Sequence, residues 1–401
     1  MKYIILVPDG VADEPLKELD GKTPLEFAST PNMDLMAQQG LSGLVRIIPP
    51  GMLPGSDVGN ISVLGYDATK GFSGRSPLEA ANLGILLKED ELAFRCNLVT
   101  IINNKMVDYS AGHISIAEAD LIMKDIIKEF SDDTVRFVTG KSYRHIAVIK
   151  TSDLKPFLAT KCTPPHDIMD SPVVAFLPQG PMAGFLSSYA GRINKLLAAH
   201  PVNKTRISQG LLPANAVWFW GQGGKPDLQM FRDRYGMDGS IISAVDLVNG
   251  IGRLIGLDII FVPGATGYYD TNYKGKAEFG LASLNDKDFV YIHVEATDEA
   301  GHNGDIKAKV DCVEKFDRLV VGTVLEYCRN NPDTRVLVTP DHPTPLAKRT
   351  HTNAPVPFVM MGKNIERNGL DGYNERSAAT VGVRFDSGVD MINYFMTVNK
   401  G

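Results

Sequence analysis

The sequence predicts an α/β fold, in which a mostly parallel sheet is flanked by helices and a smaller α+β cap domain is inserted into the chain. Three observations lead to this prediction. Short apolar runs typical of buried strands alternate with helical segments toward both ends of the chain. The middle of the chain changes to a pattern rich in Pro and Gly. At 401 residues the chain exceeds the usual size of one hydrophobic core, which favours two domains.

The N-terminal elements follow in order. Tyr3–Val7 is a continuous apolar run stopped by Pro8, which is typical of a central strand buried on both faces. A helix is predicted at Asn32–Gln39, because Thr30-Pro31 precedes it and a glycine follows it. A second strand is predicted at Leu41–Ile48.

The same alternation returns in the C-terminal half. Strand-like runs lie at Val217–Trp220, Ile259–Val262, Phe289–Val294, Val336–Thr339 and Phe358–Met361. Helical patterns lie between them, notably at Ala244–Leu254 and Asp305–Arg329. Strands separated by helices of this length indicate a parallel sheet with helices on both sides.

The domain boundaries are predicted from the change in the middle of the chain. From Phe72 to Leu212 the chain contains stretches such as Thr163-Pro164-Pro165 and Pro178-Gln179-Gly180-Pro181. We therefore expect a discontinuous core of residues 1–71 and 213–401 and an inserted domain of residues 72–212.

Composition excludes some classes of partner. Forty-seven acidic residues against 41 basic ones give a net charge of −6, and no basic block offsets it, so a nucleic-acid partner is not expected. No apolar run reaches the length of a membrane span, and the N-terminus lacks the pattern of a signal peptide. The four scattered cysteines suit a reducing compartment. We therefore expect a cytoplasmic protein; its oligomeric state is left open by the sequence.

Acidic residues and histidines recur where predicted strands end. Asp298 and His302 follow the run FVYIHV and lie four residues apart, so they converge on one cation if the segment is helical. The alternative is that Asp298 caps a helix and the histidine is incidental. Asp341 and His342 follow the next strand between prolines, and His351 comes nine residues later.

Asp9 occupies the same kind of position after the first strand, although taken alone it is better explained as a turn former in Pro-Asp-Gly. Together these segments supply three carboxylates and three imidazoles, enough for two divalent cations. The mixed nitrogen and oxygen set suits Mn²⁺ or Zn²⁺, with Mg²⁺ or Co²⁺ as further candidates. Paired cations are a recurring device of phosphoryl transfer, because they stabilise the attacking and the leaving oxygen.

Ser56 is the candidate nucleophile. It lies between glycines in Pro54-Gly-Ser-Asp-Val-Gly-Asn60, ahead of a helical segment, where the backbone can approach a phosphate closely. A serine needs a base or a metal to lower its pKa before it becomes a good nucleophile. The alternative is a helix N-cap serine.

These residues lie in motifs that resemble a known family. The motifs are VPDGVAD, LPGSDVGNISVLGYD, GRSPLEAANLGI, PGATGYYDTNYKGKA, EATDEAGHNGD, TPDHPTP and HTNAPVPF. In this combination the chain resembles the alkaline phosphatase superfamily, and more closely the archaeal-type 2,3-bisphosphoglycerate-independent phosphoglycerate mutases. The resemblance covers nearly the whole chain.

The resemblance implies an alkaline-phosphatase-like core and a division of the ligands into two sets. Asp298, His302 and His351 would hold one cation; the other would be held by Asp9, Ser56, Asp341 and His342. Ser56 would accept the phosphoryl group of 3-phosphoglycerate and return it to the 2-hydroxyl of the same glycerate. No 2,3-bisphosphoglycerate is then required.

The resemblance also assigns the inserted domain to the binding of the small phosphorylated substrate. His113 is its candidate for substrate binding and proton transfer, and Arg144 and Arg75 suit a carboxylate or a phosphate. Structural ion pairs remain the alternative for both arginines, and a structural role remains open for His113. One departure concerns the longer bacterial mutases, whose arginine-rich cap and core lysine have no clear counterparts here.

Three functions are therefore weighed. The first is the mutase. The second keeps the metal core and transfers the phosphoryl group to another acceptor, as in a homoserine kinase or a phosphatase. The third is a non-catalytic α/β binding protein with incidental histidines, which the accumulation of seven ligand types at strand and helix ends disfavours.

Overall fold

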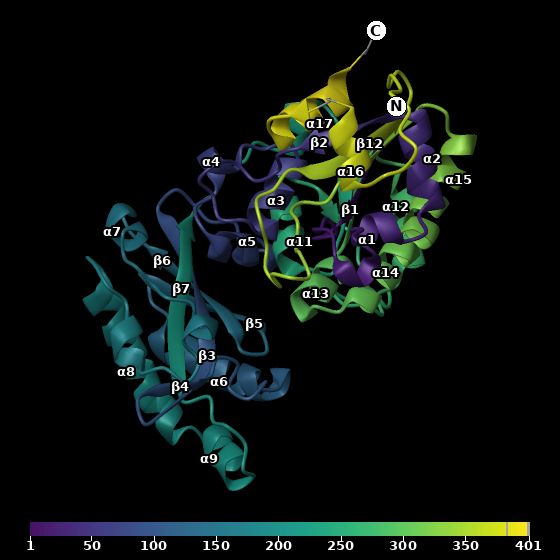
Figure 1. Cartoon of the computed structure of the whole chain (residues 1–401). Helices are drawn as coiled ribbons and strands as arrows, with labels where there is room; N and C mark the ends of the chain where they lie inside the picture. The colour runs from purple at the N-terminus through teal and green to yellow at the C-terminus, as the bar shows by residue number, and fades with distance from the viewer. Residues whose placement is uncertain (382–383, 399–401) are drawn as a thin grey trace. The chain divides into compact units, whose positions relative to one another are not determined.

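The computed structural model describes residues 1–381 and 384–398, which form two compact units. Unit 1 combines Met1–Gly71 with the chain from Leu228 onward, and unit 2 is Phe72–Asp227. Figure 1 shows the purple first segment together with the green and yellow C-terminal segment in unit 1, whereas unit 2 is blue to teal. Unit 2 is thus inserted into unit 1 in the sequence.

Unit 1 is built on a mixed sheet of eight strands in the order β13-β2-β12-β11-β1-β10-β8-β9. Strand β1 lies between β11 and β10 and is parallel to both, and β10 is parallel to β8. Strand β12 is antiparallel to β11 and to β2. The strands are β1 (Lys2–Pro8), β2 (Leu41–Val45), β8 (Gly239–Ile242), β9 (Asp258–Ile259), β10 (Phe289–Val294), β11 (Thr334–Val338), β12 (Val356–Gly362) and β13 (Arg384–Phe385).

Helices cover both faces of this sheet, because the central strands are apolar on both sides. Alternate residues such as Leu6, Ile292 and Val338 share one core with residues of α2, α12, α14 and α15. On the other face, Tyr3 packs edge-on against Phe395 of α17. The helices of unit 1 are α1 (Pro24–Phe27), α2 (Pro31–Gln39), α3 (Ser56–Val63), α4 (Ala68–Gly71), α10 (Phe231–Tyr235), α11 (Asp246–Leu254), α12 (Tyr273–Ser283), α13 (Ala296–Asn303), α14 (Ile306–Lys315), α15 (Gly322–Asn330), α16 (Glu375–Thr380) and α17 (Gly388–Thr397).

Unit 2 contains an antiparallel sheet in the order β4-β3-β6-β5, with β7 paired to β3. Its strands are β3 (Glu91–Ile102), β4 (Lys105–Asp108), β5 (Val135–Lys141), β6 (Arg144–Lys150) and β7 (Ala216–Gly224). The helices are α5 (Arg75–Asn82), α6 (Ile116–Phe130), α7 (Lys155–Leu158), α8 (Ala183–Ala199) and α9 (Pro201–Ser208). Side chains of the sheet, α6 and α8 form one buried apolar core.

The predicted fold class, a mostly parallel helix-flanked sheet with an inserted α+β unit, is confirmed. The strand Phe289–Val294 has its predicted bounds, and the long helix predicted at Asp305–Arg329 is α14, a π-helical turn at Phe316–Val321 and α15. The π-helical turn keeps the three segments continuous. No helix in the described part of the chain combines the length and the apolar character needed to cross a membrane.

Two predicted strands differ from the structure, one in its placement and one in its extent. Val217–Trp220 does form a strand, but it pairs with β3 of unit 2, so residues 213–227 pack with the inserted unit and not with the core. Of Ile259–Val262, only Ile259 lies in a strand, the edge strand β9; the Ile260 amide still donates to Ile241 of β8, and the chain turns at residues 262–265. Both differences arise because an apolar run specifies neither the partner of a strand nor how far the pairing extends.

Candidate metal centre

The candidate site lies at the carboxyl edge of the core sheet. Asp9 directly follows β1, Glu295 directly follows β10, and Asp341 lies in the loop after β11. Because β10 and β11 flank β1 and run parallel to it, the carboxyl ends of the three strands meet at one edge. The short loops bring carboxylates from distant parts of the sequence together.

A first group contains Asp298, His302 and His351. Asp298 and His302 lie on α13 one turn apart, with His302 Nε2 3.2 Å from Asp298 Oδ2. His351 Nε2 is 3.5 Å from Asp298 Oδ1, and the two histidine Nε2 atoms are 2.9 Å apart. Three donor atoms thus face a common point.

The orientation of His302 suits a ligand. Its Nδ1 is 3.1 Å from the carbonyl oxygen of Arg349, so in the neutral ring Nδ1–H donates to this carbonyl. The lone pair then lies on Nε2, the nitrogen that faces Asp298 and His351. Such outer hydrogen bonds fix the tautomer of metal-ligating histidines in other proteins.

A second group contains Asp9, Ser56, Asp341 and His342. His342 Nε2 lies 3.2 Å from Ser56 Oγ, 3.4 Å from Asp9 Oδ1 and 3.5 Å from Asp341 Oδ2. The Ser56 hydroxyl also lies 3.5 Å from Asp9 Oδ2. The rings of His342 and His351 are 4.1 Å apart between centroids, so the two groups adjoin.

The two local alternatives for Ser56 and Asp298 do not hold. Gly55 is the N-cap of α3, and Ser56 is its first residue, with its hydroxyl directed to the second group. Glu295 is the N-cap position of α13, so Asp298 lies inside the helix. Neither side chain therefore caps its helix, and both can contribute to the candidate site.

A bound cation would stabilise the ionised form of the buried carboxyl groups at this edge. Burial, Asp341 and Glu295 raise the pKa of Asp9 well above its usual range, and burial raises the pKa of Glu295 to about 8. Burial also raises the pKa of Asp298, yet hydrogen bonds from His302 and His351 hold it well below its usual range. Asp9 Oδ1 is buried and has no hydrogen-bond partner among the described residues.

The donor set also fits divalent cations. Carboxylate oxygens and imidazole nitrogens are the ligands that Mn²⁺ and Zn²⁺ accept. Burial lowers the pKa of His342, which keeps its ring in the neutral form that a cation requires. Each of the two groups is therefore a candidate cation site.

Comparisons with known proteins identify the family of the chain. A family model described as 2,3-bisphosphoglycerate-independent phosphoglycerate mutase matches residues 37–203. The mutase of that name from Methanosarcina acetivorans is 44% identical over 99% of this chain and 100% of its own length. Its counterpart from Methanothrix thermoacetophila is 46% identical over 98% of each chain. The chain belongs to the 2,3-bisphosphoglycerate-independent phosphoglycerate mutase family. The family resemblance inferred from the motifs is confirmed.

Two solved structures resemble the whole chain of this family member. A protein from Pyrococcus horikoshii superposes with a TM-score of 0.83 at 30% identity, covering 98% of this chain and 96% of its own. The cofactor-independent phosphoglycerate mutase from Thermoplasma acidophilum gives a TM-score of 0.70 at 27% identity and covers 99% of both chains. Both units therefore occur together in these relatives.

Sequence reasoning missed a layer of residues behind the predicted ligands. Asn60 Nδ2 donates to Asp341 Oδ2 at 2.7 Å, and the Tyr291 hydroxyl donates to Asn60 Oδ1 at 2.5 Å. Thr344 Oγ1 donates to Asp298 Oδ1, and His293 Nε2 is 2.9 Å from Asp9 Oδ2. Polar residues inside apolar runs, such as His293 in FVYIHV, were the signal that could have revealed them.

The predicted substrate-binding residues all lie in unit 2. Arg75 begins α5 and Arg144 begins β6, and both help to lower the pKa of Arg95, although burial is the main cause. Arg95 itself pairs with Glu79 at 3.0 Å. Arg75 and Arg144 therefore act electrostatically on the buried Arg95, a residue that the sequence did not single out.

His113 is exposed and lies in a loop of unit 2. Its backbone has a φ of 51°, in the left-handed region that a histidine seldom adopts. The Ser110 hydroxyl accepts a hydrogen bond from the His113 amide at 3.1 Å, and Ser142 next to the start of β6 donates to the carbonyl of Ile114. The turn before β6 thus packs against the loop that carries His113.

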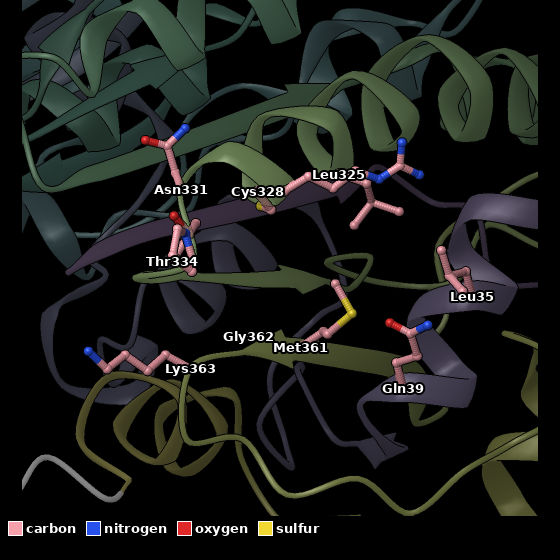
Figure 2. A pocket seen from close by; sticks show the side chains of 11 residues that line it. Leu35, Gln39, Leu325, Cys328, Asn331, Thr334, Met361, Gly362 and Lys363 are labelled. Carbon is pink, nitrogen blue, oxygen red and sulfur yellow. The ribbon is translucent and has the colours of Figure 1, made fainter.

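A separate hollow in unit 1 is not part of the metal centre. A cavity of about 230 Å³ is lined by Leu35, Cys328, Thr334, Met361 and Lys363, among others, as Figure 2 shows. Thr334 begins β11, whereas Asp341 follows its other end. This cavity therefore lies at the opposite edge of the sheet.

Helix α3 approaches the loop after β11 too closely for a larger residue at Gly59. A Cβ there would lie 2.7 Å from the carbonyl oxygen and 2.9 Å from the Cβ of Asp341. We predict that Gly59→Ala costs about 1–3 kcal/mol of stability and displaces Ser56, which lies on the same helix. Thermal unfolding and turnover measure this, and Gly191→Ala in α8, with open space around it, should cost nothing. Wild-type turnover and stability in Gly59→Ala would contradict this account.

Cation binding should release protons. The hydrogen bond to Asp298 raises the pKa of His302 to about 9, so below that pH the ring is protonated in the metal-free protein. A cation needs the neutral ring, and its apparent affinity should therefore rise with pH up to about 9. Calorimetric titration in buffers of different ionisation enthalpy counts the protons. An affinity that does not change between pH 7 and 9 would show that this proton is not displaced.

Proposed function

We propose that this chain interconverts 3-phosphoglycerate and 2-phosphoglycerate through a phosphoserine at Ser56, as in glycolysis and gluconeogenesis. The observation that carries the proposal is the position of the Ser56 hydroxyl, at the first turn of α3 and 3.2 Å from His342 Nε2. The family membership supports the choice of phosphoglycerate as substrate.

We further propose the two groups as the ligand sets of two divalent cations, Mn²⁺ or Zn²⁺. The first set is Asp298, His302 and His351; the second is Asp9, Ser56, Asp341 and His342. Bound cations would neutralise the buried carboxylates, lower the pKa of the serine hydroxyl and stabilise negative charge on the transferred group.

The residues of the chain account for the remaining chemistry. Ser56 Oγ forms the bond to phosphorus while the bond between phosphorus and the 3-oxygen of glycerate breaks. The amide groups at the start of α3 favour the negative phosphoryl group that Ser56 then carries. Ser56 is 8% exposed, which restricts access of water to the phosphoserine. The phosphoryl group is thereby protected until it is transferred to the 2-hydroxyl of glycerate.

Unit 2 is the candidate substrate-binding domain. Arg75 and Arg144 would bind the carboxylate or the phosphate of the substrate through their planar guanidinium groups. His113 is the candidate proton donor and acceptor for the glycerate hydroxyls.

The four cysteines of the chain are free thiols, which supports a cytoplasmic location for this enzyme.

Ser56 is the residue at which the phosphoserine can be tested. Ser56→Ala should lower turnover by several orders of magnitude, because it removes the covalent carrier of the phosphoryl group. Ser62→Ala is the matched control, since Ser62 is buried on the same helix outside the ligand sets. Mass spectrometry should detect phosphate on the wild-type chain after incubation with substrate and not on Ser56→Ala. Appreciable mutase turnover in Ser56→Ala would reject the phosphoserine.

Assays on different substrates separate the possible reactions. A coupled assay that converts 2-phosphoglycerate to a detectable product should respond to 3-phosphoglycerate without added 2,3-bisphosphoglycerate. Parallel assays with homoserine plus ATP, and for free phosphate, test the kinase and the phosphatase. Treatment with a chelator should abolish turnover, and metal analysis should find close to two divalent ions per chain. Activity only with homoserine and ATP would overturn the substrate assignment and leave the metal centre intact.

A further inference from the structure

His293 is a buried histidine that the proposed reaction does not use. It lies in β10, between strands β1 and β8, and its side chain is completely buried. Side chains alternate along a strand, so His293 shares a face of the sheet with Tyr291. Tyr291 reaches Asn60 of α3, which places this face on the side of the nucleophile helix.

The imidazole bridges two side chains. His293 Nε2 is 2.9 Å from Asp9 Oδ2, and His293 Nδ1 is 3.2 Å from the hydroxyl of Ser243, which follows β8. The Ser243 oxygen accepts a hydrogen bond from the amide of Val245 at 3.0 Å. Its hydroxyl proton is therefore free to point at Nδ1.

A hydroxyl at Nδ1 and a carboxylate at Nε2 favour one tautomer of the ring. If the Ser243 hydroxyl donates to Nδ1, the ring proton is on Nε2 and is donated to Asp9 Oδ2. Asp9 Oδ1, the oxygen without a hydrogen-bond partner, faces His342 Nε2 at 3.4 Å. Oδ2 of Asp9 is thus hydrogen-bonded to His293, while Oδ1 remains available to a cation.

The backbone of His293 is also held. Lys276 of α12 is fully buried, and its Nζ donates to the carbonyl oxygen of His293 at 3.0 Å. The Asp9 amide in turn donates to the carbonyl oxygen of Val294, the next residue of β10, at 3.0 Å. The imidazole and the carboxylate that it contacts are therefore fixed on one rigid part of the sheet.

Asp341 is held in a comparable way from the same strand. Tyr291 donates to Asn60, and Asn60 donates to Asp341 Oδ2. Two residues of β10, two positions apart, thus support the two carboxylates of the second group. Such supporting partners commonly set how tightly a metal binds.

We propose that His293, oriented by Ser243, is a positioning residue that holds Asp9 Oδ2 so that Oδ1 serves the second cation. The inference rests on the proposed two-cation centre. Ligand atoms of Asp9, His293 and Asp341 lie within 4.8 Å of one another, so His293 could itself reach a cation. The proposal assigns its Nε2–H to Asp9 Oδ2, 2.9 Å away, and therefore assigns His293 to the support of a ligand.

The test measures cation affinity and not turnover alone. Apo-protein prepared with a chelator is titrated with Co²⁺, and the visible absorption reports both affinity and ligand environment. His293→Phe should weaken the binding of one of the two ions by about 10–100-fold, with the absorption bands at saturation unchanged. His293→Gln, which retains an N–H donor near the Nε2 position, should restore most of the lost affinity.

The matched control is His200→Gln in unit 2. His200 is also a buried histidine whose Nε2 faces a carboxylate, that of Asp125 at 3.3 Å, and it lies far along the chain from the ligands. Its substitution should leave Co²⁺ affinity unchanged. If His293→Phe fails to fold, as judged by circular dichroism, Ser243→Ala decides the question through a several-fold loss of affinity.

The outcomes separate the two proposals. Wild-type protein that binds no divalent ion would overturn the metal centre and this inference together. Wild-type protein that binds two ions, with unchanged affinity in His293→Phe, or in Ser243→Ala where that variant decides, would overturn only the role of His293. Altered absorption bands in a saturated His293→Phe would also overturn it, because they would make His293 a ligand.

Discussion

The crowding of carboxylates at one edge of the core sheet is the constraint on which the rest of the structure depends. Asp9, Asp298 and Asp341 are almost fully buried, and burial raises the pKa of the adjacent Glu295 to about 8. Like charges removed from water are costly unless they are paired. The fold brings them together nonetheless, because parallel neighbouring strands end at the same edge. Three histidines and a layer of hydrogen-bond donors contact these carboxylates and offset part of their charge. Bound cations would offset the rest.

Strand-end patterns predicted much of the fold and the candidate site. Three apolar strands each followed by an acidic residue were enough to bring Asp9, Asp298 and Asp341 together, since strand direction determines where the loops meet. Local sequence alone left Ser56 open as a helix cap and Asp9 as a turn former. The structure resolves the first of these because Gly55 takes the capping position, which leaves the serine hydroxyl beside His342.

What the sequence did not predict depends on pairing across the sheet. The strand at Val217–Trp220 looks like a core strand, but its edge hydrogen bonds go to β3 of unit 2. His293 sits in a run that is otherwise apolar, and its role depends on which side chains lie on the neighbouring strand and after β8. Hydrophobic periodicity gives the face of a residue, and it carries no information on the partner that lies opposite.

Charge balance supports the proposed two-cation centre as a site for a phosphoryl group. Lys276 is fully buried, and burial lowers its pKa to about 8 against the attraction of the Glu295 carboxyl. In the proposed centre, the carboxylates of Asp9, Asp298 and Asp341 would face two divalent cations, and burial lowers the pKa of His342, which favours its neutral ring. The filled centre would then carry a small excess of positive charge, which an ionised Ser56 oxygen cancels and a bound phosphoryl group exceeds. Such a centre would suit an anion that arrives and leaves, since neither state leaves a large uncompensated charge among these ligands.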